Sequence, residues 1–165
     1  MTFNPSRLRS VFVLIGCVVL CYALAAAGAA GSMSAPTFYK QLVQPAWSPP
    51  AWLFGPVWTL LYTMMAVSLW RVWRQRGFVG ARVEVTLFLA QLLLNGLWSW
   101  LFFAWHEGGW AMLDIVGLAA LIAVCIQRFW RIDRFAAWLL VPYLAWVMFA
   151  SALNLDLWLR NPGLL

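Results

Sequence analysis

Apolar residues fall into five long runs, separated by short stretches that hold most of the charged residues. An α-helix rises about 1.5 Å per residue and the hydrocarbon core of a bilayer is about 30 Å thick, so a helix needs about 17 to 25 apolar residues to cross it. The runs that reach this length are Val11 to Gly31, Ala51 to Trp73, Val85 to Trp105, Trp110 to Ile126 and Phe135 to Leu155. They lack the period-two alternation of a membrane β-strand. The pattern predicts an all-α integral membrane protein, a bundle of five transmembrane helices in one domain over residues 1–165.

The first run has a second interpretation. Arg7 and Arg9 precede a short apolar stretch that ends in ALAAAGAAG, which is also the pattern of a signal peptide with a small-residue cleavage site. Against cleavage, the apolar run continues to Gly31 and is long enough to span a bilayer. Its alanines and glycines also suit close packing between helices. These features favour a first helix that is retained.

Composition agrees with a membrane protein, since 65% of the residues are hydrophobic and 10% are charged, against about 25% charged in an average soluble domain. The net charge of +6 comes from arginines that flank apolar runs. They do not form a basic face interleaved with aromatic residues, so we expect no nucleic-acid binding. Cys17, Cys21 and Cys125 lack the spacing of zinc ligands or of a disulfide framework and are expected to be buried thiols.

The basic residues also predict an orientation in the membrane. On one side of the predicted spans lie Arg7, Arg9, Arg71, Arg74, Arg76, Arg82, Arg128, Arg131 and Arg134, and on the other lie Lys40 and Arg160. This bias favours a cytoplasmic amino terminus and an external carboxyl terminus. In a bacterial cell membrane, the loop of residues 32–50, which is expected to be the largest non-helical piece, then faces the periplasm.

Polar and aromatic residues within three of the runs recur every four residues, so each set is expected on one helix face. The second run carries Phe54, Trp58, Tyr62, Met65 and Leu69; the third carries Gln91, Asn95 and Ser99 with Trp98 and Phe102 alongside; the fifth carries Trp138, Pro142, Trp146, Ala150 and Asn154. One interpretation is that these faces only pack against one another, with Pro142 making a kink. The other is a cavity for a flat apolar ligand, since indole rings stack on planar molecules and amides orient them. Tryptophans at mid-helix positions, beyond the interfacial belt, favour the cavity.

Groups for acid–base or metal chemistry are scarce. His106 is the only histidine, and Asp114 and Asp156 lie within or at the end of predicted spans. No nucleophile with a base, carboxylate pair, metal cluster or phosphate loop can be assembled from them. We expect no metal site and no required cofactor.

Three motifs, QPAWSPPAWLFGPVWTLLYTMM, AQLLLNGLWSWLFF and VPYLAWVMFASALN, resemble in this order the translocator protein family, also called tryptophan-rich sensory proteins (TspO/MBR). The resemblance covers all five predicted helices and points to a bacterial member. It implies a five-helix bundle, commonly a homodimer, that retains its first helix and binds porphyrins such as protoporphyrin IX. Eukaryotic members also bind cholesterol and benzodiazepine-type ligands.

The resemblance also implies a ligand pocket that opens toward the first loop and is walled by helices one, two, three and five. By position it implies the ligand-binding residues Trp47, Trp52, Phe54, Trp58, Asn95, Trp98, Trp146 and Ala150. Tyr62 and Gln91, from the faces described above, complete the predicted set. Ala150 matches a small-residue position whose enlargement is associated with altered ligand binding, through lost packing or pocket volume.

This chain departs from the family pattern at two places. Many members have paired tryptophans after the loop proline, whereas this chain has Ala46 before Trp47, which removes one aromatic wall. The segment LNLDLWLRN lacks the tyrosine of the proposed cholesterol motif, so sterol binding is not expected.

The prolines of the first loop have an expected role in the pocket. Pro45, Pro49 and Pro50 fix φ and stiffen the return into the second helix, which would hold Trp47 over the pocket mouth. Pro56, beside Gly55, is expected to distort the first turns of that helix.

Three functions are compatible with the sequence. The leading one is a membrane receptor or carrier for tetrapyrroles, with a role in their regulation, transport or stress signalling. The second is a light- and oxygen-dependent porphyrin-degrading enzyme in which Trp58 and Trp146 are the candidate reactive residues. The third is a structural or interaction protein without a small ligand. Coupled transport is disfavoured, because no inverted repeat or charged relay crosses the bilayer.

Overall fold

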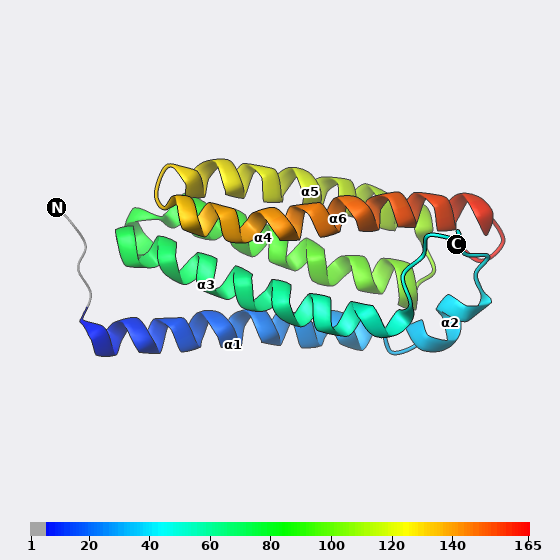
Figure 1. Cartoon of the computed structure of the whole chain (residues 1–165), viewed down its shortest axis with the longest axis horizontal. Coiled ribbons are helices and arrows are strands. Elements are labelled where there is room, and N and C mark those ends of the chain that lie inside the picture. The colour runs from blue at the N-terminus through cyan, green and yellow to red at the C-terminus, as the bar shows by residue number, and fades with distance from the viewer. Residues whose placement is uncertain (1–5) are drawn as a thin grey trace.

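A computed structural model describes residues 6–165 and confirms the five-helix prediction. The five helices long and apolar enough to span a membrane are α1 (Arg7–Gly31), α3 (Phe54–Gly80) with the 3₁₀ turn η1 (Ala51–Leu53) before it, α4 (Arg82–Ser99) continued by η2 (Trp100–Ala104), α5 (Gly108–Trp130) and α6 (Arg134–Arg160). A short helix, α2 (Ala35–Gln41), lies across one end of the bundle (Figure 1). Residues 6–165 contain no strand.

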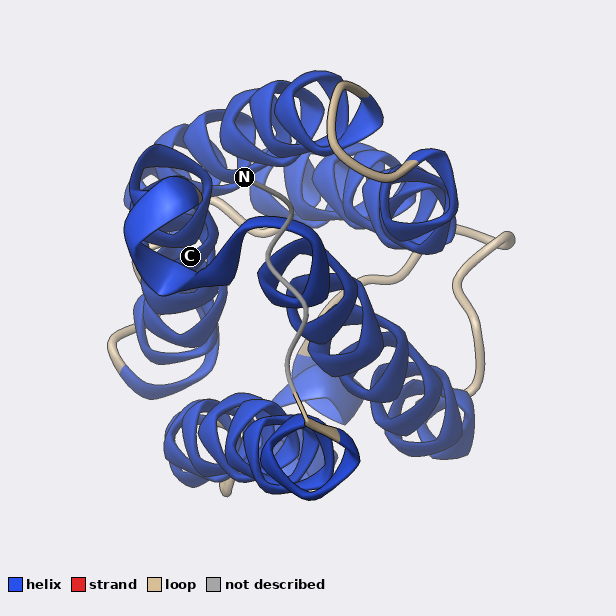
Figure 2. Cartoon of the chain, turned by 90° about the vertical axis from the view of Figure 1, so that its left-hand side faces the viewer, coloured by secondary structure: helices blue, strands red, loops and turns tan. Residues whose placement is uncertain are grey.

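The long helices are arranged as a ring. Following their packing contacts, the order is α1, α3, α6, α5, α4 and back to α1. Figure 2 shows this arrangement from the end, with the helix axes roughly aligned. Because α1 packs against both α3 and α4, the space between α1, α3, α4 and α6 is bordered by long helices.

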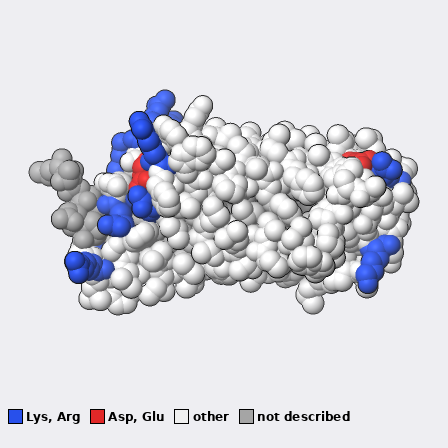
Figure 3. All heavy atoms as spheres, in the orientation of Figure 1, with Lys and Arg blue, Asp and Glu red and all other residues white. Residues whose placement is uncertain are grey.

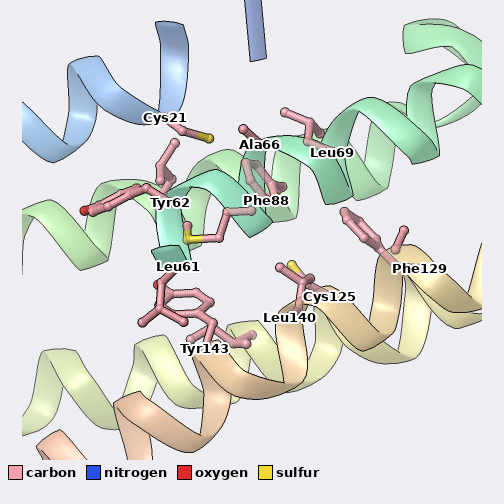
Figure 4. Close-up of a cluster of buried hydrophobic side chains, with 14 of the residues drawn as sticks. Cys21, Leu61, Tyr62, Ala66, Leu69, Phe88, Cys125, Phe129, Leu140 and Tyr143 are labelled. Atoms are coloured by element: carbon pink, nitrogen blue, oxygen red, sulfur yellow. The ribbon is translucent and has the colours of Figure 1, made fainter. Parts of the chain in front are cut away.

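One packed cluster fills most of the interior (Figure 4), and it includes side chains from α1, α3, α4, α5 and α6. All three cysteines are buried free thiols, as predicted. At Gly28, a Cβ atom would lie 3.4 Å from the Cα atom of Gly96, so α1 and α4 approach closely there. This contact is the close packing that the small residues of the first helix predicted.

The observed helices extend beyond the predicted spans, mainly at the arginine-rich end. The second span was expected to end at Trp73, but α3 continues to Gly80 through an interruption at Gly77, whose φ of 66° is left-handed. The fourth continues past Ile126 to Trp130, and the fifth begins at Arg134 and ends at Arg160. Hydropathy marks only the part of a helix that suits hydrocarbon, and charged turns outside the membrane remain helical.

The expectation of a non-helical loop over residues 32–50 is partly wrong, because Ala35–Gln41 forms α2. Pro36 lies in the first turn, where proline is tolerated, and Phe38, Tyr39 and Leu42 bury one side of the helix. Seven residues are too few to stand out by periodicity, so α2 depends on this burial.

A wider turn ends the third span, where η2 has π-helical geometry and Trp105 N–H donates to the carbonyl of Trp100 at 2.9 Å. The run of bulky residues WLFFA gives no sequence signal for the change of pitch.

Most basic side chains gather at the end of the bundle where α1 begins (Figure 3). One ion pair ties two helices there, with Arg71 Nη2 at 2.8 Å from Asp133 Oδ2. Asp133 also caps α6 by accepting from Ala136 N–H at 3.1 Å. Burial raises the pKa of Asp133, but the hydrogen bonds and charge of Arg71 and the cap outweigh this effect, so the pKa lies below its ordinary value.

Candidate ligand cavity

A cavity of about 550 Å³ lies in the half of the bundle that carries α2. This volume is within the range of about 300–1,000 Å³ typical of small-molecule sites. Its walls come from α1, α2, η1, α3, α4, η2 and α6, with little polar surface. Seven of the predicted ligand-binding residues line it: Phe54, Trp58, Tyr62, Asn95, Trp98, Trp146 and Ala150. The structure therefore brings three of the predicted helix faces to one cavity.

Aromatic rings of α3 and α6 form one wall. Phe54 lies edge-on to Trp146, with centroids 5.9 Å apart and planes at 73°. Deeper in the bundle, Trp58 lies 5.7 Å from Tyr62 and 6.2 Å from the buried ring of Tyr143. These distances and angles are those of favourable aromatic pairs, which hold the rings in place.

A chain of buried hydrogen bonds supports that wall from behind. The hydroxyl of Tyr62 donates to Asn95 Oδ1, and Asn95 Nδ2 donates to the hydroxyl of Tyr143 at 2.9 Å. Tyr143 then donates to Gln91 Oε1 at 2.8 Å. The chain joins α3, α4 and α6 and satisfies the two tyrosine hydroxyls and the Asn95 amide where the bilayer offers no partner. The buried Nε2 of Gln91 has no partner among residues 6–165.

The indole of Trp98 is held in a similar way. Its Nε1 donates to Asn154 Oδ1 at 3.0 Å, while Asn154 Nδ2 donates to the carbonyl of Gly108 at 3.1 Å. By contrast, the buried Nε1 of Trp146 has no acceptor among residues 6–165.

The cavity opens sideways, between α1 with α2 on one edge and η1 with α3 on the other. The lining residues that are exposed all lie along these two edges: Tyr22, Ala26, Ala29 and Pro36 on one, and Ala51, Gly55 and Thr59 on the other. At the deep end, the hydroxyl of Tyr22 lies 2.8 Å from Thr63 Oγ1 and donates to the Thr59 carbonyl at 3.2 Å, which ties α1 to α3. The resulting slot runs from this tie toward α2.

Three predicted residues lie outside the lining. Trp47, which was expected over the mouth, is 47% exposed and packs edge-on against Phe149 with ring centroids 5.6 Å apart. Trp52 lies in the 3₁₀ turn η1 and is 72% exposed. Gln91 lies behind the wall, in contact with Tyr143.

Other lining residues were not predicted from the sequence. Tyr39 of α2 and the small residues of α1, such as Ala25 and Gly28, form much of the remaining wall. Tyr143, which supports the wall, is one position away from the predicted stripe of α6. A tyrosine within an apolar span needs a hydrogen-bond partner for its hydroxyl, and this was the sequence signal that could have identified Tyr143.

The described lining contains no Asp, Glu, His, Lys or Arg. His106 is exposed and stacks on Phe38 with centroids 4.0 Å apart, while Asp156 is paired with Arg160. Asp114 is partly buried on α5 and does not line the cavity. Residues 6–165 contain no group of three or more His, Cys, Asp or Glu residues arranged to hold a metal. The described lining can stack on a ligand and hydrogen-bond it, and its hydroxyl groups belong to tyrosine, serine and threonine side chains.

Comparison with known proteins gives a consistent family. A sequence profile of the TspO/MBR family matches residues 17–159. The chain is 40% identical to the tryptophan-rich protein TspO of Chlorobaculum tepidum, over 93% of this chain and 99% of that protein. It is 37% identical to the translocator protein of Sus scrofa, over 76% of each chain, and 38% identical to protein CrtK of Rhodobacter capsulatus, over 86% of this chain and 89% of that one.

Proposed function

The chain belongs to the TspO/MBR family, and from that premise we propose that it is a membrane receptor or carrier for porphyrins such as protoporphyrin IX and for related flat apolar molecules. Relatives named translocator protein and tryptophan-rich sensory protein support a receptor or transporter role for this integral membrane protein. The observation that carries the proposal is the aromatic cavity of about 550 Å³ without a charged residue among its described lining.

The physical argument rests on ring faces. Trp58, Trp98 and Trp146 present indole surfaces to one cavity, and such surfaces stack on a planar conjugated ring. Because aromatic pairs and hydrogen bonds already hold these rings, little ordering is needed when a ligand enters, and that favours affinity.

The test is a titration with protoporphyrin IX in the dark, following the porphyrin absorption band and tryptophan fluorescence of the purified protein in detergent or lipid. Trp58→Phe and Trp146→Phe each remove an indole from the cavity and are expected to raise the Kd. Trp110→Phe is the matched control, because Trp110 is 63% exposed on α5 and outside the lining.

Saturable binding that both cavity variants weaken and the control leaves unchanged would support the proposal. Linear quenching that none of the variants alters would mean partitioning into detergent or lipid, and would refute it in favour of a purely structural role for the aromatic residues.

A second candidate function is light-dependent porphyrin breakdown, favoured by the position of Trp58 and Trp146 on the same cavity. Illuminated porphyrin with oxygen supplies the oxidant, so no acid or base from the protein is needed. A Trp58→Phe variant that binds normally but no longer degrades the pigment would support this function. Unchanged degradation would remove Trp58 from any specific role.

We also propose that the arginine-rich end of the bundle is cytoplasmic in a bacterial cell membrane, which makes the amino terminus internal and the carboxyl terminus external. The support is the excess of Lys and Arg at that end (Figure 3). A carboxyl-terminal alkaline phosphatase fusion should be active, and a fluorescent cytoplasmic reporter there should be dark. The reverse pattern would overturn the orientation.

Assembly as a homodimer follows as an expectation from the family resemblance. Cross-linking in native membranes, followed by mass measurement of the detergent complex, should give twice the chain mass of 18.7 kDa. A single-chain mass under both conditions would refute it.

A further inference from the structure

The proposed ligand presents an electrostatic problem for this cavity. A porphyrin with propionate groups carries carboxylates, and the described lining contains no cation to meet them. Moving a carboxylate into an apolar site without a partner is strongly unfavourable, so the carboxylates must stay at the rim. The basic residues at this end of the bundle are therefore the relevant ones.

Two basic residues, Lys40 and Arg160, belong to this end of the chain. Arg160 is already paired, with Nε 2.6 Å from Asp156 Oδ1. Lys40 is exposed and forms no ion pair with the residues that the structure describes. Figure 3 shows fewer basic side chains at this end of the bundle than at the end where α1 begins.

The geometry of α2 places Lys40 beside the cavity rim. Ala35, Pro36 and Tyr39 are the α2 residues that line the cavity. Lys40 is outside the lining but follows Pro36 by four residues, so the two occupy neighbouring positions of one helix face. Pro36 is itself exposed and forms the α2 end of the slot.

The acidic residue Glu107 is adjacent in sequence to a residue that contacts a different face of α2. Phe38 stacks on His106, which directly precedes Glu107, and Phe38 is about 160° around the helix from Lys40 at 100° per residue. Lys40 therefore lies on a different face of α2 from the stacked pair.

We propose that Lys40 is the anion anchor of this cavity, and that the ligand class is a planar apolar molecule with a carboxylate on one edge. The inference rests on the proposed porphyrin-binding function and specifies how the ligand lies. Its apolar edge points toward the tie between Tyr22 and Thr63, and its carboxylate edge lies at the α2 end, where the ammonium group of Lys40 neutralises it in partly hydrated surroundings.

The experiment compares protoporphyrin IX with its dimethyl ester, which keeps the ring and removes the charge. Lys40→Gln should raise the Kd of the diacid by about three- to fivefold, the effect expected of one exposed ion pair, and leave that of the ester unchanged. The diacid Kd of the wild type should also rise with salt, because exposed charges are screened, whereas that of the ester should not.

A charge-relocation variant supplies the matched control. Lys40→Gln combined with Gln41→Lys keeps the net charge and a cation in the last turn of α2, but moves it about 100° around the helix, away from the rim. It should bind the diacid as weakly as Lys40→Gln does. Thermal unfolding of both variants should match that of the wild type, because Lys40 is exposed.

The outcomes distinguish failure of the Lys40 anchor from failure of porphyrin binding. If the wild type binds both ligands and Lys40→Gln leaves the diacid Kd unchanged, weakens both ligands equally, or is rescued by the relocated lysine, the anchor is overturned while porphyrin binding stands. If the wild type binds neither the diacid nor the ester, the proposed function fails and the anchor fails with it.

Discussion

The hydrogen bond from Tyr62 to Asn95 is expected to couple α3 to α4 measurably. Tyr62 is 6% exposed, and its hydroxyl has Asn95 Oδ1 as its acceptor. Asn95 is also buried and uses Nδ2 to reach Tyr143. Leaving a buried donor without its acceptor costs about 1–3 kcal/mol, so Asn95→Leu should lower the free energy of unfolding by about that amount.

A double-mutant cycle isolates the pair from other consequences of the substitution. Interhelical hydrogen bonds in membrane proteins couple by about 0.6 kcal/mol on average and about 1.7 kcal/mol at most. Both partners here are buried, so we expect a coupling of about 1 to 1.7 kcal/mol between Tyr62→Phe and Asn95→Leu. The assay is equilibrium unfolding of the four proteins in mixed micelles of mild detergent and dodecyl sulfate.

Ser99→Ala is the control for mutating a cavity residue of α4, because Ser99 lines the cavity but makes no side-chain hydrogen bond to the described residues. It should change the free energy of unfolding by less than about 0.5 kcal/mol. Effects of Tyr62→Phe and Asn95→Leu that add to within about 0.3 kcal/mol would refute the reasoning, since two residues that share no interaction are additive.

Three further predictions concern contacts that hold the bundle together. The folded-state pKa of Asp133 is lowered, so its stabilising contribution is present above the unfolded pKa of about 3.9 and is lost as pH falls through the lower folded value. Asp133→Asn should therefore flatten the pH dependence of the unfolding midpoint in this acid range, and an unchanged slope would contradict this. Asn161 accepts from Val43 N–H at 2.8 Å and donates to the Val43 carbonyl at 3.2 Å. Asn161→Ala should therefore speed amide hydrogen exchange at Val43 by about tenfold, as expected for about 1.4 kcal/mol of lost protection, and exchange at the wild-type rate would show that these bonds do not protect Val43. A Cβ atom at Gly31 would lie 2.8 Å from the indole that begins η2, so Gly31→Leu should cost about 1–3 kcal/mol in thermal stability, whereas Gly16→Leu, with no atom within 4 Å of the added Cβ, should be near neutral.

The spans and the shared cavity faces were accessible from sequence because both depend on local periodicity. Hydropathy identified all five membrane helices, and the four-residue spacing of Asn95, Trp98 and Trp146 with their neighbours identified faces that line one cavity. Each of these signals is repeated over several turns of a regular helix.

The features that were not predicted depend on contacts between residues distant in sequence or on changes of helical pitch. The short helix α2 is stabilised by burial of Phe38 and Tyr39, and that burial requires the rest of the bundle. Trp52 lies in the 3₁₀ turn η1, which the sequence pattern did not distinguish from an α-helix, and the contact of Trp47 with Phe149 depends on where the loop meets α6. Spacing rules for an α-helix cannot anticipate these arrangements.

The same aromatic residues both stabilise the bundle and form the cavity, because their polar groups make hydrogen bonds between helices while their rings line the cavity. Tyr62 and Trp98 direct their hydroxyl and N–H groups to Asn95 and Asn154, respectively, while the two rings also line the cavity. The rings are therefore oriented before a ligand enters, and the ligand meets apolar surface with few competing donors. Such an interior suits a flat apolar shape and contains no charged residue in its described lining, and the proposed anchor at Lys40 would add the preference for a carboxylate.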